Sequence, residues 1–145
     1  MSNIINFEIV TQEKTVIKEE ILQVTVPTGD GEITVLANHI PLVSTIVPGV
    51  IQIKKKNEDI EIISISGGFI EVLRDKIVIL ADTAERAEEI DKERTEKARR
   101  KAEEIMKDTK RFDKERFTNI NAKIAKELAR DKAVRRWKKI KSINN

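Results

Sequence analysis

Apolar and polar residues alternate with a period of two along the first half of the chain. Several runs of six to eight residues are rich in Ile and Val, and most are separated by turn signals containing Gly, Pro, Asn or Asp. Such alternation is typical of strands with one buried face. We therefore expect seven or more short strands in an antiparallel sandwich or barrel. The clearest runs are INFEIV (5–10), ILQVTV (21–26), GVIQIKKK (49–56), DIEIISIS (59–66) and DKIVILA (75–81).

The second half of the chain has the pattern of helices, because Gly and Pro are absent after position 70. Asp82 and Glu85 have the spacing of a capping box, which predicts a helix start at residue 84. A break is expected near residues 106–113, where Asp108 or Thr109 is a candidate cap. Two helices of roughly 25–30 residues with a short connection predict an antiparallel hairpin. The apolar residues that predict the buried faces are Ala87, Ile90, Ala98, Ala102 and Ile105, then Phe117, Ile120, Ile124 and Leu128, with Val134, Trp137 and Ile140 in a different phase.

Charge divides the chain at the same place. Residues 1–83 hold 7 basic and 12 acidic side chains, whereas residues 84–145 hold 21 basic and 13 acidic side chains. The predicted fold is therefore α+β, with an antiparallel β-sandwich domain at 1–83 followed by a two-helix domain at 84–145. The basic charge is concentrated after residue 109. A basic helix with a small apolar face is weakly anchored and is suited to an acidic partner surface.

Composition excludes several kinds of site. The chain has no Cys and a single histidine, His39, so disulfides, thiolate metal sites and Cys nucleophiles are excluded. A His-clustered zinc site and a Ser-His-Asp triad are also hard to build, and we expect no catalytic site and no metal site. No apolar run approaches the ~18 residues of a membrane span. The N-terminal residues lack the pattern of a secretory signal, so a soluble intracellular protein is expected.

Gly67-Gly68 and the basic tail each allow more than one interpretation. No Lys-Ser/Thr and no helix follow the two glycines, so a tight turn or bulge is favoured over a phosphate loop. The segment from Lys132 to Lys141 surrounds Trp137 with basic residues. That pattern is compatible with binding to nucleic acid or an anionic membrane surface. It is also compatible with a solvated helix end in which Trp137 is a packing anchor, and we favour this interpretation.

The stretch IDKERT, residues 90–95, raises the question of a charged ligand. Asp91 and Arg94 are three residues apart and lie on one face of a helix. Their pairing on a solvated helix would contribute only a few tenths of a kcal/mol. The same carboxylate and guanidinium would suit an adenine amino group and phosphate oxygens, respectively. Local sequence leaves both interpretations open.

Three stretches in this order resemble the ε subunit family of F-type ATP synthases. They are GEITVLANHIPLV (31–43), SGGFIEV (66–72) and ILADTAERAEEID (79–91). The resemblance extends to about residue 130, and the tail beyond it is longer and more basic than is usual in the family. It implies a non-catalytic rotor subunit of the central stalk, which couples rotation of the c-ring to the catalytic head. Ala37-Asn38 and Thr34 depart from the usual residues of the first motif.

The same resemblance implies the partners. The sandwich would contact the γ subunit and the c-ring, with Glu32 and His39 in the contact, on the cytoplasmic side of the cell membrane and peripheral to it. Extended helices would reach the α and β catalytic subunits and inhibit ATP hydrolysis. Local chemistry alone offers a solvated turn for Glu32 and a loop hydrogen bond for His39. The alternative function is a free-standing sandwich adaptor whose basic hairpin binds acidic protein or nucleic acid, although no nucleic acid partner is expected.

The resemblance also implies a regulatory ATP site, with Mg²⁺, although no cofactor is required. IDKERT resembles the Ile/Leu-Asp-x-x-Arg-Ala motif of ε subunits that bind ATP, with Thr95 in place of Ala. A gapless alignment puts Lys123 and Glu127 where those members supply further arginines, so the phosphate-binding half is weakened. The candidate ATP-binding residues are Glu85, Ile90, Asp91, Arg94, Lys101 and Lys123.

Overall fold

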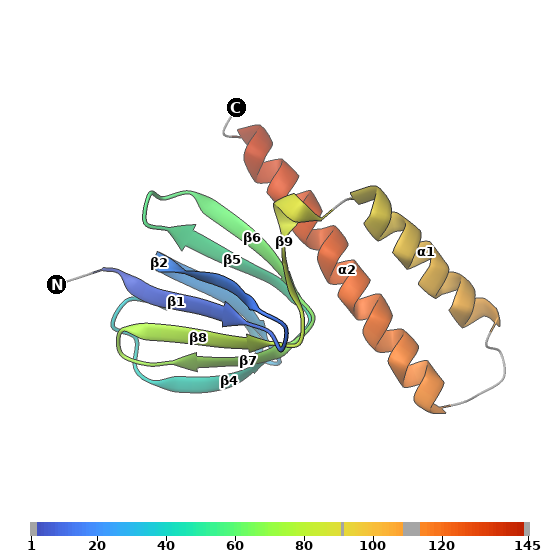
Figure 1. The fold of residues 1–145 in the computed structure, drawn as a ribbon, viewed down its shortest axis with the longest axis horizontal. Coiled ribbons are helices and arrows are strands. Elements are labelled where there is room, and N and C mark those ends of the chain that lie inside the picture. The colour runs from blue at the N-terminus through green and yellow to red at the C-terminus, as the bar shows by residue number, and fades with distance from the viewer. Residues whose placement is uncertain (1–2, 91, 109–113, 144–145) are drawn as a thin grey trace.

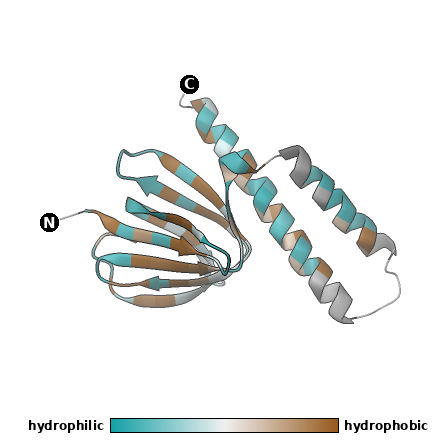
Figure 2. Ribbon diagram, viewed as in Figure 1, coloured by the Kyte–Doolittle hydropathy of each residue, from teal (hydrophilic) through white to brown (hydrophobic). Residues whose placement is uncertain are grey.

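A computed structural model describes residues 3–90, 92–108 and 114–143 of the chain. The strands form a two-layered sandwich, and a helical hairpin lies against one of its outer faces (Figure 1). Hydrophobic residues predominate in the strands and hydrophilic residues in the helices (Figure 2). The predicted α+β fold, a sandwich followed by a hairpin, is therefore confirmed.

Nine strands make up one continuous sheet that folds over on itself. Its order is β4-β7-β8-β1-β2-β5-β6-β9, and β3 also pairs with β2. All of the strand runs expected from the sequence are present. The strands are β1 (Ile5–Val10), β2 (Thr15–Thr28), β3 (Gly31–Leu36), β4 (Leu42–Ile46), β5 (Gly49–Lys55), β6 (Ile60–Ile65), β7 (Gly68–Val72), β8 (Lys76–Ala81) and β9 (Ala84–Arg86).

The long strand β2 joins the two layers. Its first half pairs with β1 as far as Ile21, and its second half pairs with β3 and β5. A register shift between Ile21 and Gln23 marks the transition. Pairing is antiparallel except between β1 and β8, which run parallel, so the expectation of a wholly antiparallel sheet is wrong at this one pair. Between the layers lies an Ile- and Val-rich core that includes Phe7, Ile21 and Ile63.

The sheet continues beyond Thr83, so the predicted helix start is wrong. Ala84–Arg86 form β9, which pairs with β6, and Ala87–Glu89 form a 3₁₀ helix, η1. The Asp82 amide donates to the Gly67 carbonyl at 2.9 Å, and the Thr83 amide donates to Ser66 Oγ at 3.0 Å. Because these bonds extend the sheet, Asp82 is not an N-cap. Helix α1 spans Lys92–Asp108.

Helix α2 (Lys114–Ile143) lies between α1 and the outer face of β5 and β6 (Figure 1). The hairpin is thus folded onto the sandwich. Ile120 and Val134 are buried as expected, but Leu128 is 47% exposed, and Ala129 and Ala133 are buried instead. The predicted connection near residues 109–113 lies outside the described residues. Within the described part, neither helix is long and apolar enough to cross a membrane.

Candidate functional site

Arg130 on α2 ties the second helix to the sandwich. Its Nε donates to Glu85 Oε2 on β9 at 3.0 Å, and its Nη1 donates to the two carboxylate oxygens of Glu127 at 3.1 and 2.8 Å. Arg130 and Glu127 are buried, whereas the Glu85 side chain is 35% exposed. Two carboxylates therefore compensate the guanidinium charge at the junction between sheet and hairpin.

Four residues of the predicted ATP site have described side chains: Glu85, Ile90, Lys101 and Lys123. Glu85 faces the second helix, and Ile90 is buried directly after η1. Lys101 on α1 and Lys123 on α2 are exposed. Asp91 lies outside the described residues, and Arg94 is described only as part of α1.

Lys126 and Arg130 are the basic residues that α2 presents near Glu85. Lys126 and Glu85 line one cavity of about 380 Å³, whose other walls are residues 11–14 and 82–84. The gapless alignment used for the sequence prediction selected Lys123 and Glu127 instead of Lys126 and Arg130. A spacing of four, which puts Lys126 and Arg130 on one helix face, is the signal that would have found them.

A second charge cluster joins side chains of β2, β5, β6 and β9. Buried Glu61 on β6 accepts from Arg86 on β9 and lies 2.9 Å from Lys55 Nζ on β5. Glu19 on β2 lies 3.8 Å from the same ammonium. The hydrogen bond to Glu61 raises the pKa of Lys55 and outweighs the opposing effect of burial. This network links three strands to the segment that leads into the hairpin.

The outer face of β4, β7 and β8 carries an exposed apolar strip. Phe69 is paired with Leu80 across β7 and β8, and Val43 lies two residues from Thr45, the partner of Phe69 on β4. Directly paired and alternate residues share a face, so Val43, Phe69 and Leu80 project together. Their exposed fractions are 71%, 55% and 56%, and β4 is preceded by Ile40 at 76%. Contiguous apolar surface of this kind is typical of a protein contact.

Glu32 and His39, the two predicted contact residues, lie seven positions apart in the chain and differ in their surroundings. Glu32 on β3 is exposed, and the structure gives it no assigned role. His39 Nδ1 lies 2.6 Å from the carbonyl oxygen of Ile40, so that nitrogen donates a hydrogen bond within the loop. Asn38 precedes it with a φ of 64°, in the left-handed region that Asn tolerates. His39 therefore has at least a loop-ordering role.

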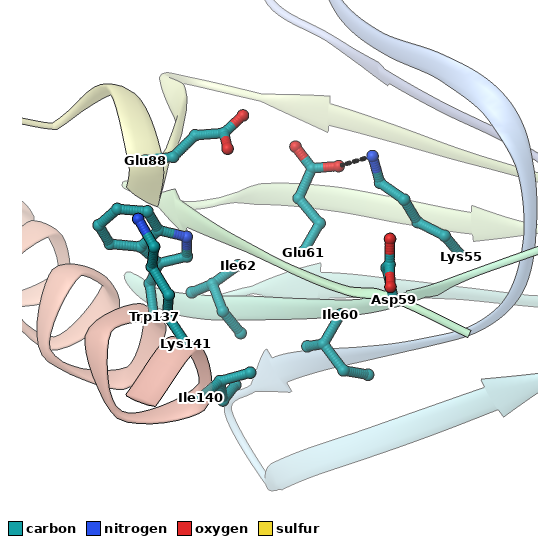
Figure 3. A pocket seen from close by; sticks show the side chains of 9 residues that line it. All are labelled: Lys55, Asp59, Ile60, Glu61, Ile62, Glu88, Trp137, Ile140 and Lys141. Atoms are coloured by element: carbon teal, nitrogen blue, oxygen red, sulfur yellow. Dashed lines mark ion pairs between the residues drawn. The ribbon is translucent and has the colours of Figure 1, made fainter. Parts of the chain in front are cut away.

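A cavity of about 280 Å³ lies between the last turns of α2 and the sheet. Trp137, Ile140 and Lys141 form one wall, and side chains of β6 and the β5–β6 turn form the other (Figure 3). Glu88 of η1 lies at its edge, beside the indole ring (Figure 3). Trp137 thus has the packing role that we favoured for it.

Comparisons with known proteins match this architecture. Residues 4–87 match the family model described as ATP synthase, Delta/Epsilon chain, beta-sandwich domain. An ATP synthase epsilon chain of Herpetosiphon aurantiacus is 45% identical over 72% of this chain and 76% of its own length. One of Dichelobacter nodosus is 38% identical over 74% and 75%, respectively.

A solved structure is also similar. A chain in the cryo-EM structure of Euglena gracilis mitochondrial ATP synthase, which comprises OSCP, F1 and the c-ring, superposes with a TM-score of 0.72. The sequences are 26% identical, and the match covers 90% of this chain and 80% of the other. The family match over residues 4–87 spans the strands of the sandwich. On these grounds the chain belongs to the epsilon chains of the ATP synthase delta/epsilon family, which are non-catalytic subunits of that complex.

Proposed function

We propose that the sandwich binds the γ subunit and the c-ring at the foot of the central stalk and transmits rotation to the catalytic head. The apolar strip of Val43, Phe69 and Leu80 carries this proposal, because three large apolar side chains on one face are suited to a protein partner. Glu32 on β3 and His39 in the segment that follows β3 contribute to the contact. In this proposal the chain lies on the cytoplasmic side of the membrane, peripheral to it.

Co-purification with γ tests the contact. Phe69→Ser removes a central apolar anchor and should weaken the complex by about 2 kcal/mol or more, as for truncation of a well-packed interface residue. Leu128→Ser is the control, because Leu128 is exposed on α2, away from this face. Equal retention of γ by both variants would argue against the strip as the contact.

The helical hairpin acts as the inhibitory element in this proposal. It is folded onto the sandwich here, and extension would carry the basic α2 toward acidic surfaces of the α and β subunits. Removing residues 92–145 should raise ATP hydrolysis by the assembled enzyme under inhibiting conditions and leave assembly with γ intact. An unchanged hydrolysis rate under those conditions would contradict the inhibitory role.

A regulatory ATP site is a second proposal for the junction between sheet and hairpin. It is supported by the cavity that Glu85 and Lys126 share and by Arg130, which bonds to Glu85. Phosphate oxygens are good bidentate acceptors for a guanidinium. They would, however, have to compete with Glu85 and Glu127 for Arg130.

Calorimetric titration of the whole chain with ATP and Mg²⁺ tests this site. Arg130→Ala should lower the affinity at least about tenfold, in line with the loss of a charge-assisted hydrogen bond. Lys123→Ala is the discriminating control, because Lys123 is exposed on the same helix. Absence of heat with millimolar ATP would remove the proposal, and a larger effect of Lys123→Ala would favour the residues chosen from sequence.

A further inference from the structure

We propose that residues 133–140 of α2 form an apolar clasp that holds the hairpin on the sandwich. The clasp consists of Ala133, Trp137 and Ile140. Its receiving surface is formed by Val50 and Ile62 on the sheet, Ala87 of η1 and the partly buried Ile60. These seven residues make a second hydrophobic cluster, separate from the core between the two layers.

The position of the clasp allows it to control the hairpin. Ala87 lies in η1, between the last sheet strand and the start of α1, and its side chain is fully buried in the cluster. Ala133 is also fully buried, so the helix and sheet approach closely at this point. The clasp therefore closes on the segment through which the hairpin is joined to the sandwich (Figure 1). Its release would free α2, while β9 and η1 remain with the sheet.

The indole ring is the main component of the clasp. Trp137 packs on the cluster, and Lys141 Nζ lies 5.0 Å from the ring centroid, within the range of a cation–π contact. The cavity beside it shows that the last turns of α2 meet the sheet less tightly than Ala133 does (Figure 3). A large apolar side chain that is only partly packed stabilises the docked helix, but by less than a fully buried side chain would, so the helix can still be released.

Magnitudes favour the apolar contact over the ionic one. The Arg130–Glu85 pair joins a buried guanidinium to a carboxylate that is 35% exposed. Glu127 still pairs with Arg130 when Glu85 is neutralised, so loss of the Glu85 contact should change the docking equilibrium by less than about tenfold. Loss of a partly buried Trp ring should change the docking equilibrium about 10- to 100-fold. Docking should therefore persist at about 1 M salt, where charges are screened beyond ~3 Å.

Spin-label distances in the full chain test the clasp. The chain has no Cys, so Asn57→Cys and Lys138→Cys, both at exposed positions, place one label on the β5–β6 turn and one on α2. Trp137→Ala in this background should raise the population at long distance about tenfold or more. Ala is the best helix former, so the substitution does not weaken α2 itself.

Two further variants make the outcome decisive. Lys139→Ala, at an exposed position on the same helix, should leave the distances unchanged, and Glu85→Gln should release less of α2 than Trp137→Ala does. Amide protection in β1 and β8 must be retained, which shows that the sandwich is folded. Equal populations in Trp137→Ala and Lys139→Ala, or a larger release by Glu85→Gln, would overturn the clasp.

The consequence for the enzyme rests on the proposed inhibitory function. In assembled ATP synthase, Trp137→Ala should lower ATP hydrolysis, because a released hairpin extends more readily. If the spin-label distances lengthen but hydrolysis is unchanged, the clasp stands and the inhibitory proposal fails. If the distances do not change, the clasp fails whatever the hydrolysis rate.

Discussion

At the scale of single residues, Gly68 lies where β7 and β8 approach too closely for a side chain. A Cβ built at Gly68 would lie 2.1 Å from the Leu80 carbonyl oxygen, and its φ of 153° is unfavourable for other residues. Gly67 and Ser66 form the short link from β6 in one layer to β7 in the other. The tight turn or bulge expected from the glycine pair is therefore a crossover between layers.

We expect Gly68→Ala to lower the free energy of unfolding by at least about 3 kcal/mol, because the new methyl group forces two backbone segments apart. Urea denaturation of the whole chain measures the loss. Gly29→Ala is the matched control, since a Cβ there meets nothing within 4 Å. It should be neutral or stabilise by up to about 1 kcal/mol. Similar losses in both variants would contradict the steric explanation.

Lys55 gives the sandwich a specific dependence on alkaline pH. Its pKa is raised above the ordinary 10.5, first by the hydrogen bond to Glu61 and then by nearby carboxylates. Because the pKa of Lys55 is higher in the folded than in the unfolded state, protonated Lys55 stabilises the fold at pH values below 10.5. This stabilisation is lost as the pH rises through the pKa of Lys55 in the folded state. The free energy of unfolding should therefore fall above pH 10.5 more steeply in the wild type than in Lys55→Gln.

Denaturation at several pH values from about 9.5 to 11.5, about one unit either side of the ordinary Lys pKa, measures this slope. Lys56→Gln serves as the control, because Lys56 is an exposed neighbour at 62%. It should keep the wild-type slope. A wild-type slope in Lys55→Gln would show that the Lys55–Glu61 contact does not contribute.

At the scale of elements, helix α2 buries a face that its own apolar pattern indicates only in part. Ala129, Ala133 and Val134 are buried together with charged Arg130 and Asp131. Asp131 is satisfied by Arg135 on its own helix and lies 3.8 Å from Arg99 on α1. Charged residues are tolerated there because α2 lies between two other elements that supply partners.

Ala133→Glu should detach α2 from the sheet, because a carboxylate at this fully buried position has no partner in the cluster. The expected loss of docking free energy is about 3 kcal/mol or more. Hydrogen exchange should show lower amide protection in α2 with unchanged protection in the core strands. Ala122→Glu, at an exposed position of the same helix, should have no such effect. Unchanged α2 protection in Ala133→Glu would contradict the docked position of the helix.

At the scale of the whole molecule, the chain consists of a sandwich that extends through β9 and a hairpin that begins at α1. Arg86 on β9 bonds to buried Glu61, and Ala87 completes the cluster under α2. The segment 84–90 therefore belongs structurally with the sheet. A domain boundary at residue 83 remains a prediction. A chain truncated at that position would lack β9, which is part of the sheet.

A fragment of residues 1–90 should therefore be more stable than one of residues 1–83. The shorter fragment lacks β9 and leaves Glu61 without Arg86, which should cost at least about 1 kcal/mol. For a domain of this size, that corresponds to a Tm lower by about 5 °C or more. Thermal unfolding followed by circular dichroism compares the two, and equal Tm values would show that β9 is dispensable.

The sequence by itself determined the strands, the two-part architecture and the family. Runs such as INFEIV form strands because alternation and β-branching act over neighbouring residues. The three family motifs are likewise local stretches. A buried Ile120 and a change of phase before Trp137 were also predictable, since they follow from helical spacing.

The tertiary structure decided what depends on partners distant in sequence. Asp82 and Glu85 do not form the predicted capping box, because residues 84–86 instead pair with β6 through backbone hydrogen bonds. Parallel pairing of β1 with β8 joins segments about 70 residues apart, and no local pattern encodes it. Arg130 forms a hydrogen bond with Glu85, 45 residues away in the chain, and Trp137 packs against the cluster that contains Ile62. Such contacts are selected by which surfaces the folded layers leave available for burial, so only the packed molecule determines them.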